Sequence, residues 1–300
     1  MGWDKLREQR YKRMKELGVI DLNMQLSPRN ESVPAWEDEK HKAWQERRME
    51  VYAAQVTNMD WNIGRIIKYL KDKGEFDNTL ILYQHDNGAC HVEYTTTRKG
   101  SWSREVTTDG RKLPVQAGNI PGLMPGPQTT FQSYGYGWAN VSSTPYRQYK
   151  TYNHEGGIKS PLIVSWPDGL AAESKGKLRG DVCHVIDMMP TLLEVAGIDS
   201  IEQKPMAFEG RSFMPAFRDK QVATHDAIFW NYAKGKAVRV GDWKLVAAKP
   251  SAWELYNLKK DGSELNNLAA SMPEKVKTLE ALYTAWDKRT NLGRKSGKKK

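Results

Sequence analysis

Apolar residues recur at helical spacing in two stretches near the start of the chain. The first covers residues 3–17 and is followed by Gly18, a typical stop signal. The second runs from about residue 36 to residue 73 and ends before Gly74, a residue type that favours the left-handed turn closing a helix. Residues 19–35 between them are rich in Asn, Ser and Pro. The pattern predicts two helices joined by a loop.

Two short runs follow a different pattern, in which consecutive residues are apolar. They cover residues 79–83 (TLILY) and 161–166 (PLIVSW), as is typical of strands buried inside an α/β sheet. Residues 89–150 are rich in Gly, Pro, Thr, Ser and Tyr without a sustained period, which predicts a long irregular segment. Residues 182–196 return to helical spacing. This order of strand, loop, strand and helix favours an α/β fold.

The last part of the chain changes to short strand-like runs separated by Gly, Lys and Pro turns. A final amphipathic stretch at 273–288 predicts a helix. We therefore expect an α/β domain over residues 1–222, a small antiparallel sheet with a terminal helix over 223–290, and a basic tail over 291–300. The predicted strands of the small sheet cover residues 227–230, 237–240, 243–247 and 253–256.

Composition narrows the class of protein. The chain has 39% hydrophobic residues and no run of about 18 apolar residues, so a soluble protein without a membrane partner is expected. Five of the residues behind its net charge of +10 crowd the last seven positions, and no helix-turn-helix, zinc-finger or RNP pattern accompanies them. No nucleic-acid partner is therefore expected. The first ten residues lack the apolar core of an export signal, so nothing in them indicates a compartment.

Two cysteines, Cys90 and Cys183, allow one disulfide at most. Neither belongs to a C-x-x-C pair or to a Cys/His cluster with zinc spacing. Each is interpreted as a partly buried free thiol.

Candidate chemistry begins directly after the first predicted strand, with Asp86, Asn87 and Gly88. Ligands of open α/β sheets bind beyond the carboxyl ends of strands. Carboxylate and amide oxygens are hard ligands of the kind that calcium or magnesium takes, although two oxygens fill only part of a calcium shell of about six to eight. The alternative is a plain turn, because Asn before Gly tolerates left-handed conformations.

A second candidate segment runs from Lys150 to the strand at residue 161. A loop lysine at a sheet edge can neutralise an oxyanion, and the paired glycines Gly156 and Gly157 permit close backbone approach. His154 could donate a proton. The alternatives are a solvated surface lysine and a hydrogen-bonded structural histidine.

Together these segments resemble the C-terminal half of the sulfatase family, within the alkaline-phosphatase-like superfamily. The tyrosine-rich stretch before Lys150 looks most like that of bacterial arylsulfatases. The resemblance runs nearly end to end. It rests on six motifs in the family's order, which are residues 51–60 (VYAAQVTNMD), Asp86-Asn87-Gly88, Lys150 with the EGGI sequence at 155–158, residues 161–167 (PLIVSWP), 187–198 (DMMPTLLEVAGI) and 253–258 (WELYNL).

The resemblance implies site residues and cofactors. The positions matching Asp86 and Asn87 bind calcium in that family, with magnesium as a possible substitute, and the position matching Lys150 is catalytic and binds the sulfate group. It also suggests a substrate-binding role for His154. His85 stands where a small residue such as serine is more usual.

The nucleophile that the resemblance implies is a formylglycine made from cysteine in a Cys-x-Pro-x-Arg motif. Neither Cys90 nor Cys183 fits that motif. Ser143 fits a Ser-x-Pro-x-Arg variant but lies only seven residues before Lys150, whereas the modified residue belongs to the first half of the family's fold. We therefore expect the nucleophile, and most of the metal shell, to come from an N-terminal half that acts as the partner of this chain.

The expected fold is a partial α/β/α sandwich followed by the small sheet with its helix. The expected function is sulfuric ester hydrolysis of the arylsulfatase type, with this chain alone inactive. Two alternatives stay open, a non-catalytic remnant or interaction module of the same fold and a related phosphoesterase or phosphonate hydrolase. Full-length relatives of this kind are typically periplasmic or secreted.

Overall fold

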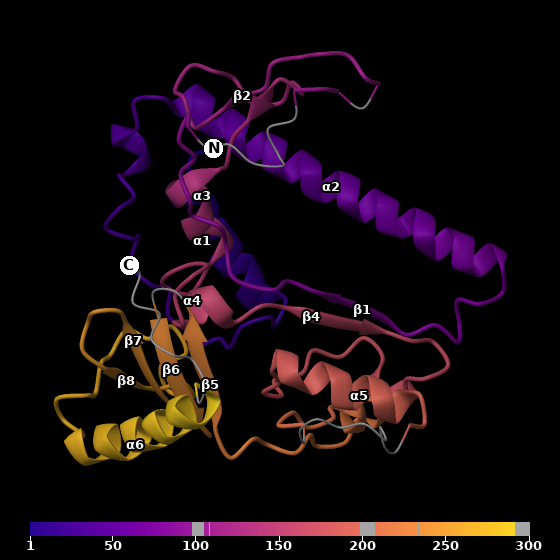
Figure 1. Ribbon diagram of the computed structural model, residues 1–300, viewed down its shortest axis with the longest axis vertical. Helices are drawn as coiled ribbons and strands as arrows, with labels where there is room; N and C mark the ends of the chain where they lie inside the picture. Colours follow the sequence, from indigo (N-terminus) through magenta and orange to yellow (C-terminus); the bar gives the residue numbers. More distant parts are fainter. Residues whose placement is uncertain (98–104, 108, 199–207, 233–234, 292–300) are drawn as a thin grey trace.

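The computed structural model describes residues 1–97, 105–107, 109–198, 208–232 and 235–291 (Figure 1). Tryptophan side chains hold its N-terminal part together, where α1 (Trp3–Glu16) meets α3 (Gly135–Ser142). The Trp3 ring lies edge-on to those of Trp36 and Trp138, with centroids 4.7 and 5.5 Å away. Burial of these large rings fixes segments that are far apart in the sequence against one another.

The long helix α2 (Lys42–Asp72) follows a 3-10 turn, η1 (Trp36–Asp38). The prediction of a helix from about residue 36 is wrong at its start, because the Trp36 N–H donates to the Asp4 carboxylate at 2.8 Å and the chain turns before Lys42. Most of α2 lies apart from the other elements (Figure 1). No helix in the described ranges is long and apolar enough to span a membrane. Five large apolar side chains on α2 are 40–62% exposed: Val56, Met59, Trp61, Ile66 and Tyr69.

The segment over residues 89–150 contains more regular structure than its composition predicts. Besides α3, it forms a short parallel pair, β2 (Gln116–Ala117) with β3 (Thr130–Phe131). Its aromatic rings pack mainly on other rings, as in the stacked pair Tyr94 and Phe131 at 5.2 Å. Such packing supplies order without a sequence period.

Strand β1 (Ile81–Gln84) pairs antiparallel with β4 (Leu162–Ser165). The prediction of fully buried strands is wrong: the pair has no third strand among the described residues, and Ile163 is 58% exposed. One face is covered by the cluster around Phe213 and Phe217, which receives Leu162 and Val164. Ile163 points to the other face, for which no core cluster occurs among the described residues.

Helix α5 (Met188–Val195) follows a 3-10 turn, η3 (Val185–Asp187), so the helix predicted from residue 182 starts late. The buried Asp187 carboxylate accepts backbone N–H bonds from His184 and Arg211 at 2.7 and 2.8 Å, which holds the chain in the turn. Short helical turns complete this region: α4 (Glu155–Ile158), η2 (Ala172–Ser174) and η4 (Met214–Arg218).

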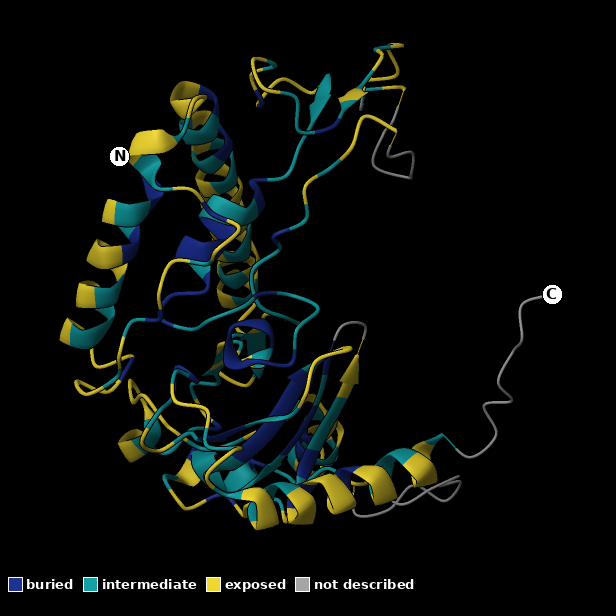
Figure 2. Cartoon of the chain, turned by 90° about the vertical axis from the view of Figure 1, so that its left-hand side faces the viewer, coloured by how far each residue is buried: buried dark blue, intermediate teal, exposed yellow. Residues whose placement is uncertain are grey.

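The C-terminal part is a four-stranded antiparallel sheet covered by a helix, as predicted. Its strands lie in the order β5 (Ile228–Tyr232), β6 (Gly235–Val240), β7 (Trp243–Ala248) and β8 (Glu254–Asn257). Helix α6 (Pro273–Thr290) packs Leu279 and Tyr283 against Val238, Leu245 and Leu255 of the sheet. Buried residues run through the strands, while the outer side of α6 is exposed (Figure 2). The proposed basic tail lies almost wholly outside the described residues.

Candidate functional site

The two candidate segments of the sequence meet at the end of β1. The Gly88 N–H donates to the Gly157 carbonyl at 2.9 Å, and the Lys150 N–H donates to the Ala89 carbonyl at 3.0 Å. A Cβ atom on Gly88 would lie 1.8 Å from the Gly156 oxygen, so only glycine permits this approach. The turn carrying Asp86 and Asn87 is thereby fixed to the loop carrying Lys150.

The predicted metal ligands lie on the open side of this turn. Asp86 is exposed, and its carboxylate has no hydrogen bond or ion pair with the described residues. Asn87 is half-buried and donates its Nδ2 to the Gly88 carbonyl at 2.8 Å, which leaves its side-chain oxygen as an acceptor. These hard oxygens fit a calcium or magnesium ion as two ligands of about six to eight. No group of three or more His, Cys, Asp or Glu suited to a metal occurs among the described residues.

Lys150 is half-buried, and its ammonium group likewise has no ion pair or hydrogen bond within the described ranges. The backbone around it is strained, since Gln148 and Thr151 have φ angles of 66° and 80°. Non-glycine residues adopt such angles only when surrounding structure holds them, and such residues cluster at functional sites. The loop therefore presents an uncompensated cation in a fixed backbone conformation.

His154 lies in the interior, with 1% of its surface exposed. Its Nε2 is 3.3 Å from Glu254 Oε2 on β8. The structure thus joins the turn that carries Asp86 and Asn87 to the loop that carries Lys150, while the His154 side chain faces the C-terminal sheet.

Arg147 and Glu254 form the first anchor of this loop. The Arg147 guanidinium donates to Glu254 at 3.0 Å, to the Tyr256 hydroxyl at 2.8 Å and to the Glu264 carbonyl at 3.1 Å. Burial alone would raise the pKa of Glu254, but hydrogen bonds from His154 and Tyr256 and the charge of Arg147 lower it to about 2. Glu254 is therefore a carboxylate at neutral pH.

Lys244, Glu155 and Glu264 form a second anchor. Lys244 on β7 is fully buried, and its Nζ lies 2.7 Å from Glu155 Oε1 and 2.8 Å from Glu264 Oε1. Glu264 also accepts the Glu155 backbone N–H at 2.8 Å. Burial opposes charge on Lys244, but the two carboxylates outweigh it and raise its pKa. Sequence reasoning missed this network; the available signal was a lysine inside an otherwise apolar strand.

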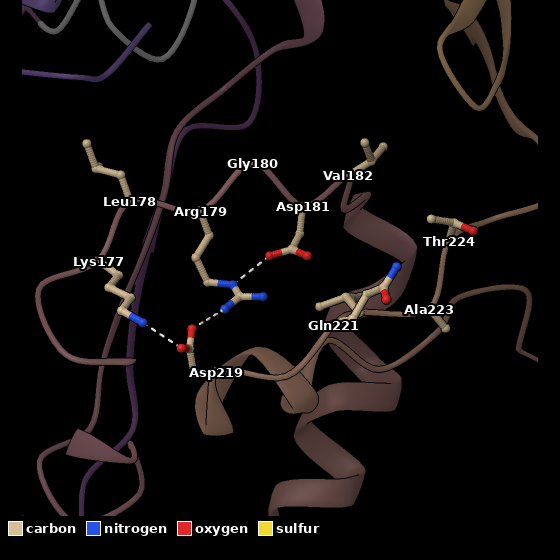
Figure 3. Close-up of a pocket in the computed structure, with 11 residues that line it drawn as sticks. Lys177, Leu178, Arg179, Gly180, Asp181, Val182, Asp219, Gln221, Ala223 and Thr224 are labelled. Carbon is tan, nitrogen blue, oxygen red and sulfur yellow. Dashed lines mark hydrogen bonds and ion pairs between the residues drawn. The ribbon is translucent and has the colours of Figure 1, made fainter. Parts of the chain in front are cut away.

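A pocket among the described residues lies away from the two candidate segments. Its cavity of about 420 Å³ is lined by residues 177–182, 219 and 221–224 (Figure 3). Lys177 and Arg179 both pair with Asp219, at 2.5 and 2.7 Å. These positive charges are already compensated, and neither Asp86 nor Lys150 lines the pocket.

The remaining nucleophile candidates are Cys90, Cys183 and Ser143. Cys90 is a partly buried free thiol, as predicted, whereas Cys183 is an exposed one, so the prediction of partial burial is wrong there. Desolvation and the neighbouring Asp187 and Asp181 carboxylates raise the pKa of Cys183 to about 11, so it is protonated at neutral pH. Ser143 is buried at the C-terminal end of α3, where its hydroxyl faces the Gly156 carbonyl at 3.5 Å.

Comparison with known proteins agrees with this architecture. Residues 22–198 match the sulfatase family model, and residues 147–288 match the model described as N-sulphoglucosamine sulphohydrolase, C-terminal. The chain is 30% identical, over 97% of its length, to an uncharacterized sulfatase of Schizosaccharomyces pombe, of which it covers 53%. It is 34% identical, over 68% of its length, to the arylsulfatase of Klebsiella aerogenes, of which it covers 42%.

A crystal structure of a candidate sulfatase, yidJ of Bacteroides fragilis, shares the fold, with a TM-score of 0.51 at 18% identity over 96% of this chain and 50% of that one. The fold is thus of the alkaline-phosphatase-like α/β class. Within that class, the chain belongs to the sulfatase family. It spans about half the length of the curated relatives named above.

Proposed function

We propose that this chain is the metal- and sulfate-binding half of a sulfuric ester hydrolase of the arylsulfatase type. The observation that carries the proposal is the pair of backbone hydrogen bonds that hold the Asp86–Asn87 turn against the Lys150 loop. In this proposal, these bonds bring two hard oxygen donors and an uncompensated cation to one edge of the strand pair. A sulfate ester carries negative charge on its sulfuryl oxygens, which is the chemistry that such a set of groups binds.

Each residue has a distinct part in this proposal. Asp86 and Asn87 hold a calcium ion, with magnesium as the alternative, and that ion supplies a Lewis acid that polarises a sulfuryl oxygen. Lys150 directs its ammonium group to the sulfate and stabilises negative charge as the ester bond breaks. In this proposal His154, which is buried against Glu254, holds the Lys150 loop in place, and the substrate-binding role that the resemblance suggests for it stays a prediction.

The attacking group is, in this proposal, a formylglycine of a segment outside the chain. No Cys-x-Pro-x-Arg motif occurs in the sequence, and the chain spans about half of its relatives. Unburied apolar side chains on three elements give that segment a surface to pack on, since burial of such surface favours association. They include Trp61 and Ile66 of α2, Ile163 of β4, and Met189 and Leu192 of α5.

The test is hydrolysis of a chromogenic aryl sulfate, with calcium, by this chain extended upstream by its genomic sequence. Lys150→Ala and Asp86→Ala should each lower kcat/KM by about 100-fold or more, because each removes charge stabilisation from the reacting group. Lys175→Ala, at an exposed position on a different loop, is the matched control and should leave the rate unchanged.

The same extended protein is also assayed on the matched aryl phosphate. A preference for the sulfate ester supports the proposal. A preference for the phosphate ester would favour the phosphoesterase alternative, and full activity of Lys150→Ala would contradict the role of Lys150.

A further inference from the structure

The backbone that carries Lys150 is fastened on both sides to the C-terminal sheet. Three residues before it, Arg147 donates to Glu254 and Tyr256 of β8. Five residues after it, Glu155 pairs with the buried Lys244 of β7 at 2.7 Å. The strained conformations at Gln148 and Thr151 lie between these two attachments. Strain of this kind persists only where neighbouring structure over-determines it.

We propose that Lys244 is a positioning residue for Lys150, and that it acts through Glu155. This inference rests on the proposed function, and it adds a residue of the C-terminal sheet that holds the proposed site in place. Lys244 itself is fully buried and touches neither the Lys150 side chain nor the open side of the turn.

The charges of the cluster explain why a lysine is needed there. Glu155 is 4% exposed and Glu264 fully buried, and both carboxylates face one ammonium group. Without Lys244, the only ion-pair partner left to the two buried carboxylates among the described residues would be the half-exposed Lys159, 3.9 Å from Glu155. We expect Glu155 to be the residue that moves, because it belongs to the short α4 turn, whereas the Glu264 backbone accepts from Arg147 and donates to the Asp261 carbonyl. A shift of Glu155 would displace the loop that starts at Lys150.

The positions of the two carboxylates that pair with Lys244 distinguish a positioning role from simple stabilisation of the sheet. Neither Glu155 nor Glu264 lies in β5, β6, β7 or β8. Lys236 on β6 differs, because its ammonium lies over the Trp253 ring at 3.9 Å, and Lys236→Met is therefore the matched control. We therefore expect that loss of the Lys244 charge loosens residues 147–157 more than it loosens strands β5–β8.

The first experiment needs no turnover and uses the 300-residue chain. Hydrogen exchange and the rate of Lys150 acylation, both read by mass spectrometry, are compared for the wild type, Lys244→Met and Lys236→Met. Lys244→Met should raise exchange at residues 147–157 about tenfold and change the acylation rate at least threefold, while β5–β8 exchange as before. Adding Glu264→Gln to Lys244→Met should restore part of the protection, since glutamine still accepts the Glu155 N–H but carries no charge.

Unchanged exchange at residues 147–157, or an equal rise in the loop and the strands, would overturn the inference. If Lys244→Met does not fold, Glu155→Gln takes its place, because it removes the charge through which Lys244 holds the loop and leaves Lys244 paired with Glu264. The same changes at residues 147–157 are expected, and the same results would overturn the inference.

In the extended protein, Lys244→Met should lower kcat at least tenfold with a smaller change in KM, and Lys244→Arg should recover part of the loss. A wild-type extended protein without activity would overturn the proposed function, while the exchange result would still decide the role of Lys244.

Discussion

At the scale of single residues, the carboxylates around the Lys150 loop depend on their neighbours for their charge. Glu254 is the clearest case, because its pKa lies at about 2 against an ordinary 4.5. Its side chain is 21% exposed, and its carboxylate accepts hydrogen bonds from Arg147 at 3.0 Å and from the Tyr256 hydroxyl at 2.5 Å. The folded state therefore stabilises the ionised form of Glu254 more than the unfolded chain does.

This shift predicts a pH-dependent part of the stability. A lowered pKa in the folded state stabilises above the unfolded value of about 4.5, and the contribution is lost as the pH falls toward 2. Glu254→Gln should thus cost on the order of 1–3 kcal/mol at pH 6 and almost nothing near pH 2. Urea unfolding of both proteins across this pH range measures the difference. Glu194→Gln, at an exposed position, is the control, and a Glu254→Gln cost that does not change with pH would contradict the account.

Residue-scale reasoning from the sequence singled out Asp86, Asn87 and Lys150 as candidates but missed the contacts that hold the Lys150 loop. The first two directly follow a strand, and the glycines after Lys150 indicate close approach, so these signals are local. Lys244 meets Glu155 across 89 residues, and no local pattern specifies such a partner.

At the scale of elements, the short helix α4 is built on glycine. A Cβ atom on Gly156 would lie 2.2 Å from the Arg147 oxygen and 2.4 Å from the Gln148 oxygen. These are backbone atoms of the same loop, which a side chain cannot displace without moving Lys150.

Gly156→Ala should therefore lower the free energy of unfolding by about 1–3 kcal/mol, through forced backbone movement in the loop. Gly64→Ala in α2 is the contrasting variant, because its Cβ would meet nothing within 4 Å. It should stabilise by about 0.5–1 kcal/mol, the usual gain from replacing glycine inside a helix. Thermal unfolding of the two variants tests the contrast, and equal effects on both would contradict it.

Element prediction succeeded where the apolar period is long and failed where distant contacts decide. The periods of α1 and α6, and the strand-like runs of β5–β8, appear in the structure close to their predicted positions. Helix α3 was missed because its sequence, GYGWANVS, has two glycines and no clear period. Its order comes from Trp138, whose ring packs on Trp3 and Trp36.

At the scale of the whole molecule, apolar side chains stay unburied, which the expectation of a partial sandwich includes and the individual strand patterns do not. The runs TLILY and PLIVSW predict strands buried on both faces, yet Ile163 of the second run is 58% exposed. Trp61 of α2 is likewise 62% exposed. An apolar run predicts that a surface is buried, but it does not identify the segment that covers it. In our proposal the segment that carries the nucleophile covers it, which also explains why a chain with Lys150 in place should lack activity.

The most direct test of this account is hydrolysis of an aryl sulfate, with calcium, by the 300-residue chain alone and by the same chain joined to its upstream genomic sequence. Activity only in the joined protein is the predicted result. Activity of the chain alone would contradict the account and direct attention to Ser143. Inactivity of the joined protein would also contradict it, in favour of a fold that has kept its sulfate-binding half without the reaction.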